Sequence, residues 1–195
     1  MQYGFSSSNT ESWTSIGFEK NMFNSITLDF EQSLRMQDNI SSFKQTFSEA
    51  SISYNFFNDL KIFIPVRYAV FQEKIKKRVS IGFSYKYNFK PVTLKYRSKF
   101  QRSFQEYKIF NPSLRNKLSI HYKINKKVKP YFSGEVFHSI NADQYENDEK
   151  RWSIGVNIGI LKKKKIKIFY TYKIEGINKS DQDKTNVIGL AYNLK

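Results

Sequence analysis

Hydrophobic and polar residues alternate with a period of two along almost the whole chain. In the clearest run, Val79, Ile81 and Phe83 share one parity, while Ser80 and Gly82 take the other. Successive side chains of a strand point to opposite faces, so this pattern predicts strands with one apolar and one polar face. The same pattern recurs at residues 26–35, 60–70, 92–100, 117–124, 151–160, 166–174 and 188–194. No helical periodicity competes with these runs, which predicts an all-β protein.

The length and spacing of the runs indicate the kind of β-protein. Runs of about ten residues match tilted strands that cross a bilayer. Short turns alternate with longer polar loops, an asymmetry typical of outer-membrane barrels. We therefore predict that residues 1–195 form a single domain, a transmembrane, antiparallel, up-and-down β-barrel of about twelve strands, with roughly ten as the alternative. The larger count includes a strand within residues 2–8.

Alternation alone does not say which face is outside, because a soluble lipocalin-like barrel has the same period with its faces reversed. Aromatic residues near the ends of the runs resemble the interfacial girdles of membrane barrels. These residues are Trp13, Tyr54, Phe89, Trp152 and Tyr192. We therefore expect the apolar face to meet lipid. Within residues 43–54 the apolar parity changes, which predicts a β-bulge near Ser48 and Glu49.

Composition narrows the chemistry. There is no cysteine, which excludes disulfides, thiol catalysis and cysteine-ligated metals. Lys and Arg number 33 against 17 acidic residues, for a net charge of +16. Solvated lysines in turns and a polar lumen account for this charge; attraction to phosphate is the alternative. We expect no nucleic-acid partner and no cofactor.

Charged residues on the polar face of the runs predict a polar network inside the barrel. Its members are Glu31, Arg35, Arg67, Arg97, Lys117, His121 and Glu135. Bases outnumber acids on this face, so an open lumen would favour anions. A barrel of this size is often filled by its own side chains, and conduction then does not follow.

Two basic clusters lie at predicted strand ends, where lipid phosphates would be within reach. The first, at the rim with the longer loops, comprises Lys74, Lys76, Lys77 and Arg78. The second, in a tight turn at the other rim, comprises Lys162, Lys163, Lys164 and Lys165. Solvated lysines without a ligand are the alternative for both.

The sequence offers little for catalysis. If the hairpin turns at Lys127, His121 would face Ser133, and Ser119 would face Glu135, which are the ingredients of an acyl hydrolase. The group points inward near a turn, so we interpret His121 as a hydrogen-bonded lumen residue and expect no enzyme. Four acidic residues, Asp143, Glu146, Asp148 and Glu149, lack the spacing of a calcium loop, so we expect no metal.

The order of residues along the strands resembles the DUF2490 family of outer-membrane barrels, which is best known from Bacteroidota. The similarity is strongest at residues 114–123 and 129–135, and it also covers residues 28–35, 43–49, 65–68 and 95–101. The resemblance implies an outer-membrane barrel of a Gram-negative bacterium and brings no established activity with it. The chain departs from the pattern by ending in Asn193, Leu194 and Lys195 rather than on an aromatic residue.

These observations lead to three hypotheses about function. The first is a structural or accessory subunit of an outer-membrane assembly, in contact with outer-membrane lipids, lipopolysaccharide and other outer-membrane proteins. The second is a small, porin-like, anion-preferring pore, and the third is a lipid-modifying enzyme that uses His121. Residues 1–8 have neither a basic nor an apolar segment of a signal peptide, so we expect the mature chain or one whose start is missing.

Overall fold

The computed structural model describes residues 9–23, 25–57, 59–140, 145–178 and 181–195. The strands are β1 (Asn9–Phe23), β2 (Ile26–Gln37), β3 (Ser42–Asn55), β4 (Leu60–Phe71), β5 (Ile75–Phe89), β6 (Val92–Gln105), β7 (Lys108–Ile109), β8 (Ser113–Tyr122), β9 (Val128–Ile140), β10 (Tyr145–Leu161), β11 (Lys164–Glu175) and β12 (Asp183–Leu194). Within these ranges there is no helix long and apolar enough to cross a membrane.

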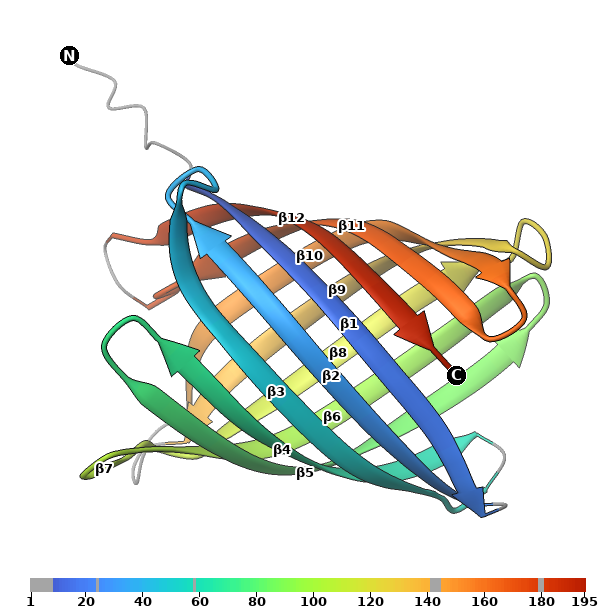
Figure 1. Cartoon of the computed structure of the whole chain (residues 1–195), viewed down its shortest axis with the longest axis horizontal. Coiled ribbons are helices and arrows are strands. Elements are labelled where there is room, and N and C mark those ends of the chain that lie inside the picture. The colour runs from blue at the N-terminus through green and yellow to red at the C-terminus, as the bar shows by residue number, and fades with distance from the viewer. Residues whose placement is uncertain (1–8, 24, 58, 141–144, 179–180) are drawn as a thin grey trace.

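The described strands form one closed barrel (Figure 1). Each barrel strand pairs antiparallel with its neighbour in the chain, and β5 pairs with β6 to keep the wall continuous. The two-residue β7 pairs only with β6, so eleven strands make up the wall. With an odd number, β1 and β12 run in the same direction and close the barrel through a parallel pairing, Asn9 to Thr185 through Phe18 to Leu194.

The predicted barrel of about twelve strands is therefore confirmed, with one difference. The extra strand among the described residues is β7, which lies outside the wall. The strand that we predicted within residues 2–8 falls outside the described residues.

The apolar face of the strands points outward, as predicted. Large hydrophobic side chains that are 40 to 60% exposed cover the outer wall. They include Ile16, Phe30, Ile52, Ile64, Ile81, Phe100, Ile120, Phe132, Ile154, Ile168 and Leu190. Buried positions are instead mainly polar or charged, including Glu11, Lys99, Glu135 and Lys173. This is the reverse of a lipocalin-like barrel and is the arrangement that a strand wall needs in lipid.

The two rims differ in their connections. We call the end that carries the β2–β3, β4–β5, β6–β8, β9–β10 and β11–β12 connections the loop end, and the opposite end the turn end. At the turn end, only Lys90 and Pro91 connect β5 to β6. At the loop end, residues 106–112 connect β6 to β8 and contain β7. The contrast is smaller than predicted, because only residues 72–74 connect β4 to β5 at the loop end.

Two of the aromatic residues that point inward, Phe47 and Trp13, do so contrary to prediction. Phe47 is only 2% exposed and shares the inward parity of Glu49, so no bulge is needed at residues 48–49. The irregularity in this hairpin lies instead where Arg35 pairs with Gln45 and Met36 with Phe43. Trp13 lines the lumen and does not belong to an outer girdle.

Candidate functional site

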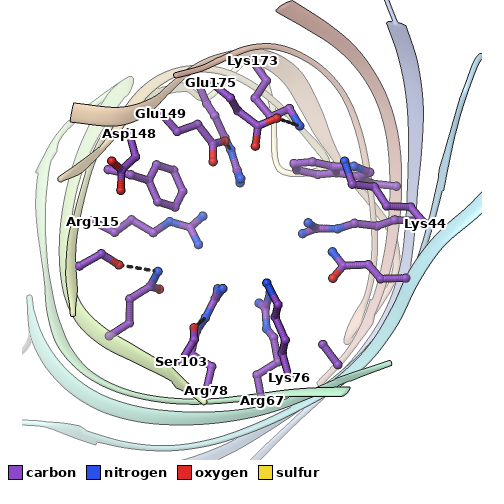
Figure 2. Close-up of a pocket in the computed structure, with 18 of the residues that line it drawn as sticks. Lys44, Arg67, Lys76, Arg78, Ser103, Arg115, Asp148, Glu149, Lys173 and Glu175 are labelled. Carbon is purple, nitrogen blue, oxygen red and sulfur yellow. Dashed lines mark hydrogen bonds and ion pairs between the residues drawn. The ribbon is translucent and has the colours of Figure 1, made fainter. Parts of the chain in front are cut away.

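A polar cavity of about 310 Å³ occupies the loop end of the lumen. Its wall is built from side chains of most of the barrel strands, because every second residue of each strand points inward. Figure 2 shows these side chains converging from all sides of the barrel. Eight basic residues line the cavity against four acidic ones. The cavity is therefore electropositive.

Five of the basic residues are arginines, which we call the arginine ring. They are Arg35 on β2, Arg67 on β4, Arg78 on β5, Arg115 on β8 and Arg151 on β10. These strands are distributed around the barrel, so the guanidinium groups approach the same cavity from different sides.

On one side of the arginine ring, aromatic side chains lie between neighbouring arginines. The guanidinium carbon of Arg67 lies 3.8 Å from the ring centre of Phe47, and that of Arg35 lies 5.1 Å from the same ring. Arg35 also lies 3.9 Å from the ring centre of Trp13. Stacking of this kind contributes about 0.5–2 kcal/mol per contact and fixes the plane of the guanidinium.

Arginines and aromatic rings continue to follow one another on the other side of the β1–β12 pairing. Arg151 lies 5.0 Å from the Trp13 ring centre and 4.6 Å from that of Phe137. Arg115 lies 4.7 Å from Phe137 on its other side. Four arginines and three aromatic rings thus form one continuous chain of contacts from Arg67 to Arg115.

On the turn-end side of the cavity, carboxylates bind two arginines of the arginine ring. Arg115 donates two hydrogen bonds to Glu135, at 2.6 and 2.8 Å, and Arg97 adds a longer one at 3.4 Å. Arg67 donates to Glu49 at 2.7 Å. Since Glu135 is 4% exposed, this carboxylate is screened little by water, and the bidentate pair fixes Arg115 firmly.

A second cluster of charges lies at the mouth of the cavity around Glu11, which is 2% exposed. Its carboxylate accepts hydrogen bonds from Lys44 at 2.5 Å, Lys173 at 3.0 Å and the Trp13 indole at 2.8 Å. Lys173 also pairs with Glu175 at 2.6 Å. Trp13 is thereby fixed at its indole nitrogen as well as by its ring contacts.

Three cations of the cavity have no carboxylate partner among the described residues. Arg35 lies over the rings of Trp13 and Phe47, and its Nε has no hydrogen-bond partner among the described residues. Arg78 donates to the Ser103 hydroxyl at 3.0 Å. Lys76 lies over the rings of Phe71 and Phe110. These groups retain positive charge and hydrogen-bonding capacity that the protein does not neutralise.

Three of the four acidic side chains of the cavity gather on one side, where Arg151 and Lys173 pair with two of them. In Figure 2, Asp148, Glu149 and Glu175 lie along one arc, and Arg67, Lys76 and Arg78 lie along the opposite arc. The acidic arc belongs to β10 and β11, whereas the basic arc belongs to β4 and β5. Glu149 pairs with Arg151. An anion in this cavity would therefore be drawn toward the β4–β5 wall.

The remaining predicted lumen residues lie deeper. Glu31 and Lys167 line a second cavity, of about 220 Å³, at the turn end. Lys99 is 4% exposed and has no ion pair among the described residues. Lys117 lies opposite Glu135 in the β8–β9 hairpin. Of the predicted network, the structure therefore joins Arg97 to Glu135 and brings Arg35 and Arg67 together on Phe47.

The strand pairing on which an acyl-hydrolase site would depend does not occur. In the β8–β9 hairpin His121 pairs with Tyr131, Ser119 with Ser133, and Lys117 with Glu135, so the register differs by two residues from the expected one. The His121 ring stacks on Tyr131 with ring centres 5.3 Å apart. Glu135 is engaged by Arg115, away from the histidine.

Successive side chains of a strand point to opposite faces, so the first basic cluster is divided between the lumen and the outer wall. Lys76 and Arg78 line the lumen cavity, whereas Lys77 lines a groove on the outer wall and Lys74 lies in the adjoining connection. The four residues therefore do not form one lipid-contacting patch.

The second basic cluster lies at the turn end, where Lys162 and Lys163 form the turn and Lys164 and Lys165 begin β11. All four are exposed, and Lys165 lines the turn-end cavity. Of the acidic residues considered as calcium ligands, Asp143 and the Glu146 side chain lie outside the described residues, and Asp148 and Glu149 line the loop-end cavity. No group of three or more metal-ligating side chains occurs in the described ranges.

Comparison with known proteins identifies the family. A family model described as "Protein of unknown function (DUF2490)" matches residues 10–184. The chain belongs to this family. A search of curated proteins finds no match.

Among solved structures, a KdgM porin matches this DUF2490 chain with a TM-score of 0.51 at 11% identity, over 80% of each chain. An anion-selective porin from Comamonas acidovorans gives a TM-score of 0.46 at 9% identity, over 92% of this chain and 55% of the porin. The outer-membrane OmpT of Vibrio cholerae gives 0.44 at 12% identity, over 77% and 55%. The chain thus spans about half the length of the last two proteins, and the first match establishes similarity of fold.

Sequence reasoning missed part of the site. Arg115 and Arg151 have lumen parity but were not recognised as members of a common ring. Trp13 was expected in an outer aromatic girdle, and Phe47 and Phe137 were not expected in the lumen. The parity of Phe47 with Glu49, and of Phe137 with Glu135, is the signal that would have placed these two rings inside.

Proposed function

We propose that this protein is an outer-membrane barrel whose lumen binds small anions and conducts them, with the arginine ring as its selectivity element. The observation that carries the proposal is the chain of guanidinium and aromatic groups around one cavity, in which Arg35 and Arg78 lack a carboxylate partner among the described residues. The fold of the wall, with exposed apolar side chains outside and polar ones inside, supports placement in a membrane.

Aromatic stacking suits this function for a physical reason. A guanidinium whose face lies on an aromatic ring keeps its N–H groups free at the edge, where carboxylate or phosphate oxygens are bound. The stack also restrains a long side chain, so less conformational entropy is lost when an anion binds. The ring is therefore preorganised for oxyanions.

The layer of ion pairs below the ring limits the size of the solute. Glu49 with Arg67, and Glu135 with Arg115 and Arg97, project into the lumen between the two cavities. In a barrel of this width, such side chains leave only a small open cross-section in the lumen. We infer a narrow path for small anions such as inorganic phosphate or short carboxylates, and a low conductance.

In this proposal the loop end faces the outside of the cell and the turn end faces the periplasm, as in other barrels of this type. An origin in a Gram-negative bacterium, expected from the family resemblance, is part of this proposal. An origin in Bacteroidota stays a prediction. The accessory-subunit hypothesis also stays a prediction, to be tested by co-purification at fixed stoichiometry from native membranes. The cavity chemistry supports the pore more directly.

The proposal is tested by recording single channels in planar bilayers after refolding in detergent. Under a KCl gradient we expect small, discrete conductance steps and a reversal potential whose sign shows chloride preference. Absence of conductance across salts and voltages, with heat-dependent gel mobility confirming a folded barrel, would rule out the pore.

A further inference from the structure

On the β5–β6 part of the outer wall, two cations lie near the loop end beside apolar side chains. In β5, Lys76 and Arg78 line the lumen, so Lys77 between them points outward. In β6, Gln101 and Ser103 line the lumen, so Arg102 between them also points outward and is exposed.

The two cations are close neighbours across the β5–β6 pairing. Lys77 pairs with Phe104, and Arg102 pairs with Val79, so Lys77 and Arg102 are diagonal neighbours on one face. At this spacing, two long cationic side chains can bind one group from both sides. Neither forms an ion pair with any described carboxylate.

Lys77 lines a groove of about 730 Å³ on the outer wall, and so does Phe104, its pairing partner on β6. Its apolar lining comprises Tyr68, Val70, Phe71, Ile75 and Phe104. Tyr68 and Ile75 are each 44% exposed. Glu73 and Glu106 also line the groove, but they belong to the connections beyond the strand ends, whereas Lys77 and Arg102 lie within the strands. The groove thus joins an apolar wall to Lys77, and Arg102, the diagonal neighbour of Lys77, lies just outside its lining.

A guanidinium on a lipid-facing wall is destabilising, most at mid-membrane and less toward the interface, unless an anion accompanies it. Strand β6 ends at Gln105 at the loop end, and Arg102 lies just before this end. Its long side chain can therefore extend to the level of the lipid headgroups. The chemistry that satisfies this position is a phosphate at the membrane surface with acyl chains beneath it.

We propose that Lys77 and Arg102 bind a phosphate of a lipid A-type glycolipid in the outer leaflet, with an acyl chain lying in the adjoining groove. The site depends on the membrane placement proposed above, but it does not depend on conduction through the lumen. It also replaces the four-residue basic cluster expected from sequence with a pair drawn from two strands.

The test uses the full chain refolded in detergent and native mass spectrometry with purified bisphosphorylated lipid A. The double variant Lys77→Gln/Arg102→Gln removes the pair. The matched control, Lys76→Gln/Arg78→Gln, removes the same charges from adjacent positions that face the lumen. Heat-dependent gel mobility of each variant shows that it folds.

We expect wild type and the lumen control to retain lipid A, and the outer-wall variant to bind it about tenfold more weakly, the change that corresponds to about 1.4 kcal/mol. Dephosphorylated lipid A should bind wild type as weakly as lipid A binds that variant. Equal binding by all three proteins, or equal binding of both lipids, would overturn the proposal. If lipid A binds as expected but the protein shows no conductance in planar bilayers, only the proposed pore is refuted.

Discussion

Arg35 lies on the ring of Trp13, with its guanidinium carbon 3.9 Å from the ring centre, and Trp13 is itself held by a hydrogen bond from its indole to Glu11. The acid thus fixes the aromatic ring, and the ring fixes the cation without neutralising it. Direct pairing of Arg35 with Glu11 would have removed the charge from the cavity. The relationship explains how the lumen can be rigid and electropositive at once.

Replacing Arg35 with glutamine should weaken anion preference more than it affects folding. Removing one charge from a water-filled cavity costs a nearby anion about 1 kcal/mol, so we expect the ratio of anion to cation permeability to fall about fivefold. Reversal potentials in a salt gradient measure this ratio. The control is Arg102→Gln, which removes an arginine from the outer wall and should leave the ratio unchanged; equal effects of both variants would contradict the account.

The Glu135→Gln variant should destabilise the barrel. It leaves Arg115 buried beside a neutral amide, and loss of one partner of a buried pair costs about 3 kcal/mol. Urea unfolding of the protein in lipid vesicles measures the loss. Glu106→Gln, at an exposed position in the β6–β8 connection, provides the control and should change stability by less than about 0.5 kcal/mol. Similar stability of wild type and Glu135→Gln would show that the pair is not formed.

The two tryptophans should report opposite faces of the wall. Trp13 faces the lumen, whereas Trp152 is 48% exposed on the outer wall and stacks on Phe132. In vesicles of brominated lipid, we expect the Trp13→Phe protein to lose most of its fluorescence, because its remaining tryptophan contacts acyl chains. The Trp152→Phe protein should be quenched little by these lipids. The reverse pattern would mean that the faces have been assigned the wrong way.

Gly189 should tolerate no side chain. A β-carbon at this position would lie 2.0 Å from the Phe169 ring, which covers the glycine from the neighbouring strand. We expect Gly189→Ala to lower the free energy of unfolding by about 1–3 kcal/mol, the usual cost of overpacking. At Gly159 the nearest atom would be 3.7 Å away, so Gly159→Ala should be nearly neutral. Equal stability of the two variants would contradict the packing described.

Much of the wall could be predicted from the sequence, because a strand in a barrel repeats one simple rule. Alternation from Val79 to Phe89 assigned the two faces of β5 correctly, and its neighbours followed the same rule. The register of the β8–β9 hairpin could not be predicted this way. A shift of two residues preserves the face of every side chain, so periodicity does not distinguish His121 opposite Ser133 from His121 opposite Tyr131.

The arginine ring was harder to predict for a related reason. Its members come from five strands, and their common level depends on strand tilt and stagger around the whole barrel. Trp13 was misplaced because an aromatic residue near a strand end suits a lipid interface as well as a stack on a lumen arginine. Phe47 was misplaced because its parity differs from that of the apolar residues at the other end of β3, which a β-bulge would also explain.

The measurement that tests the central claim most directly is the reversal potential of the wild-type protein in planar bilayers, compared with that of a variant carrying Arg35→Glu and Arg78→Glu. These two arginines have no carboxylate partner among the described residues, so charge reversal acts on the free positive charge of the ring. We predict chloride preference in wild type and a shift toward potassium in the variant. Cation preference in the wild type, or identical potentials for the two folded proteins, would contradict the account.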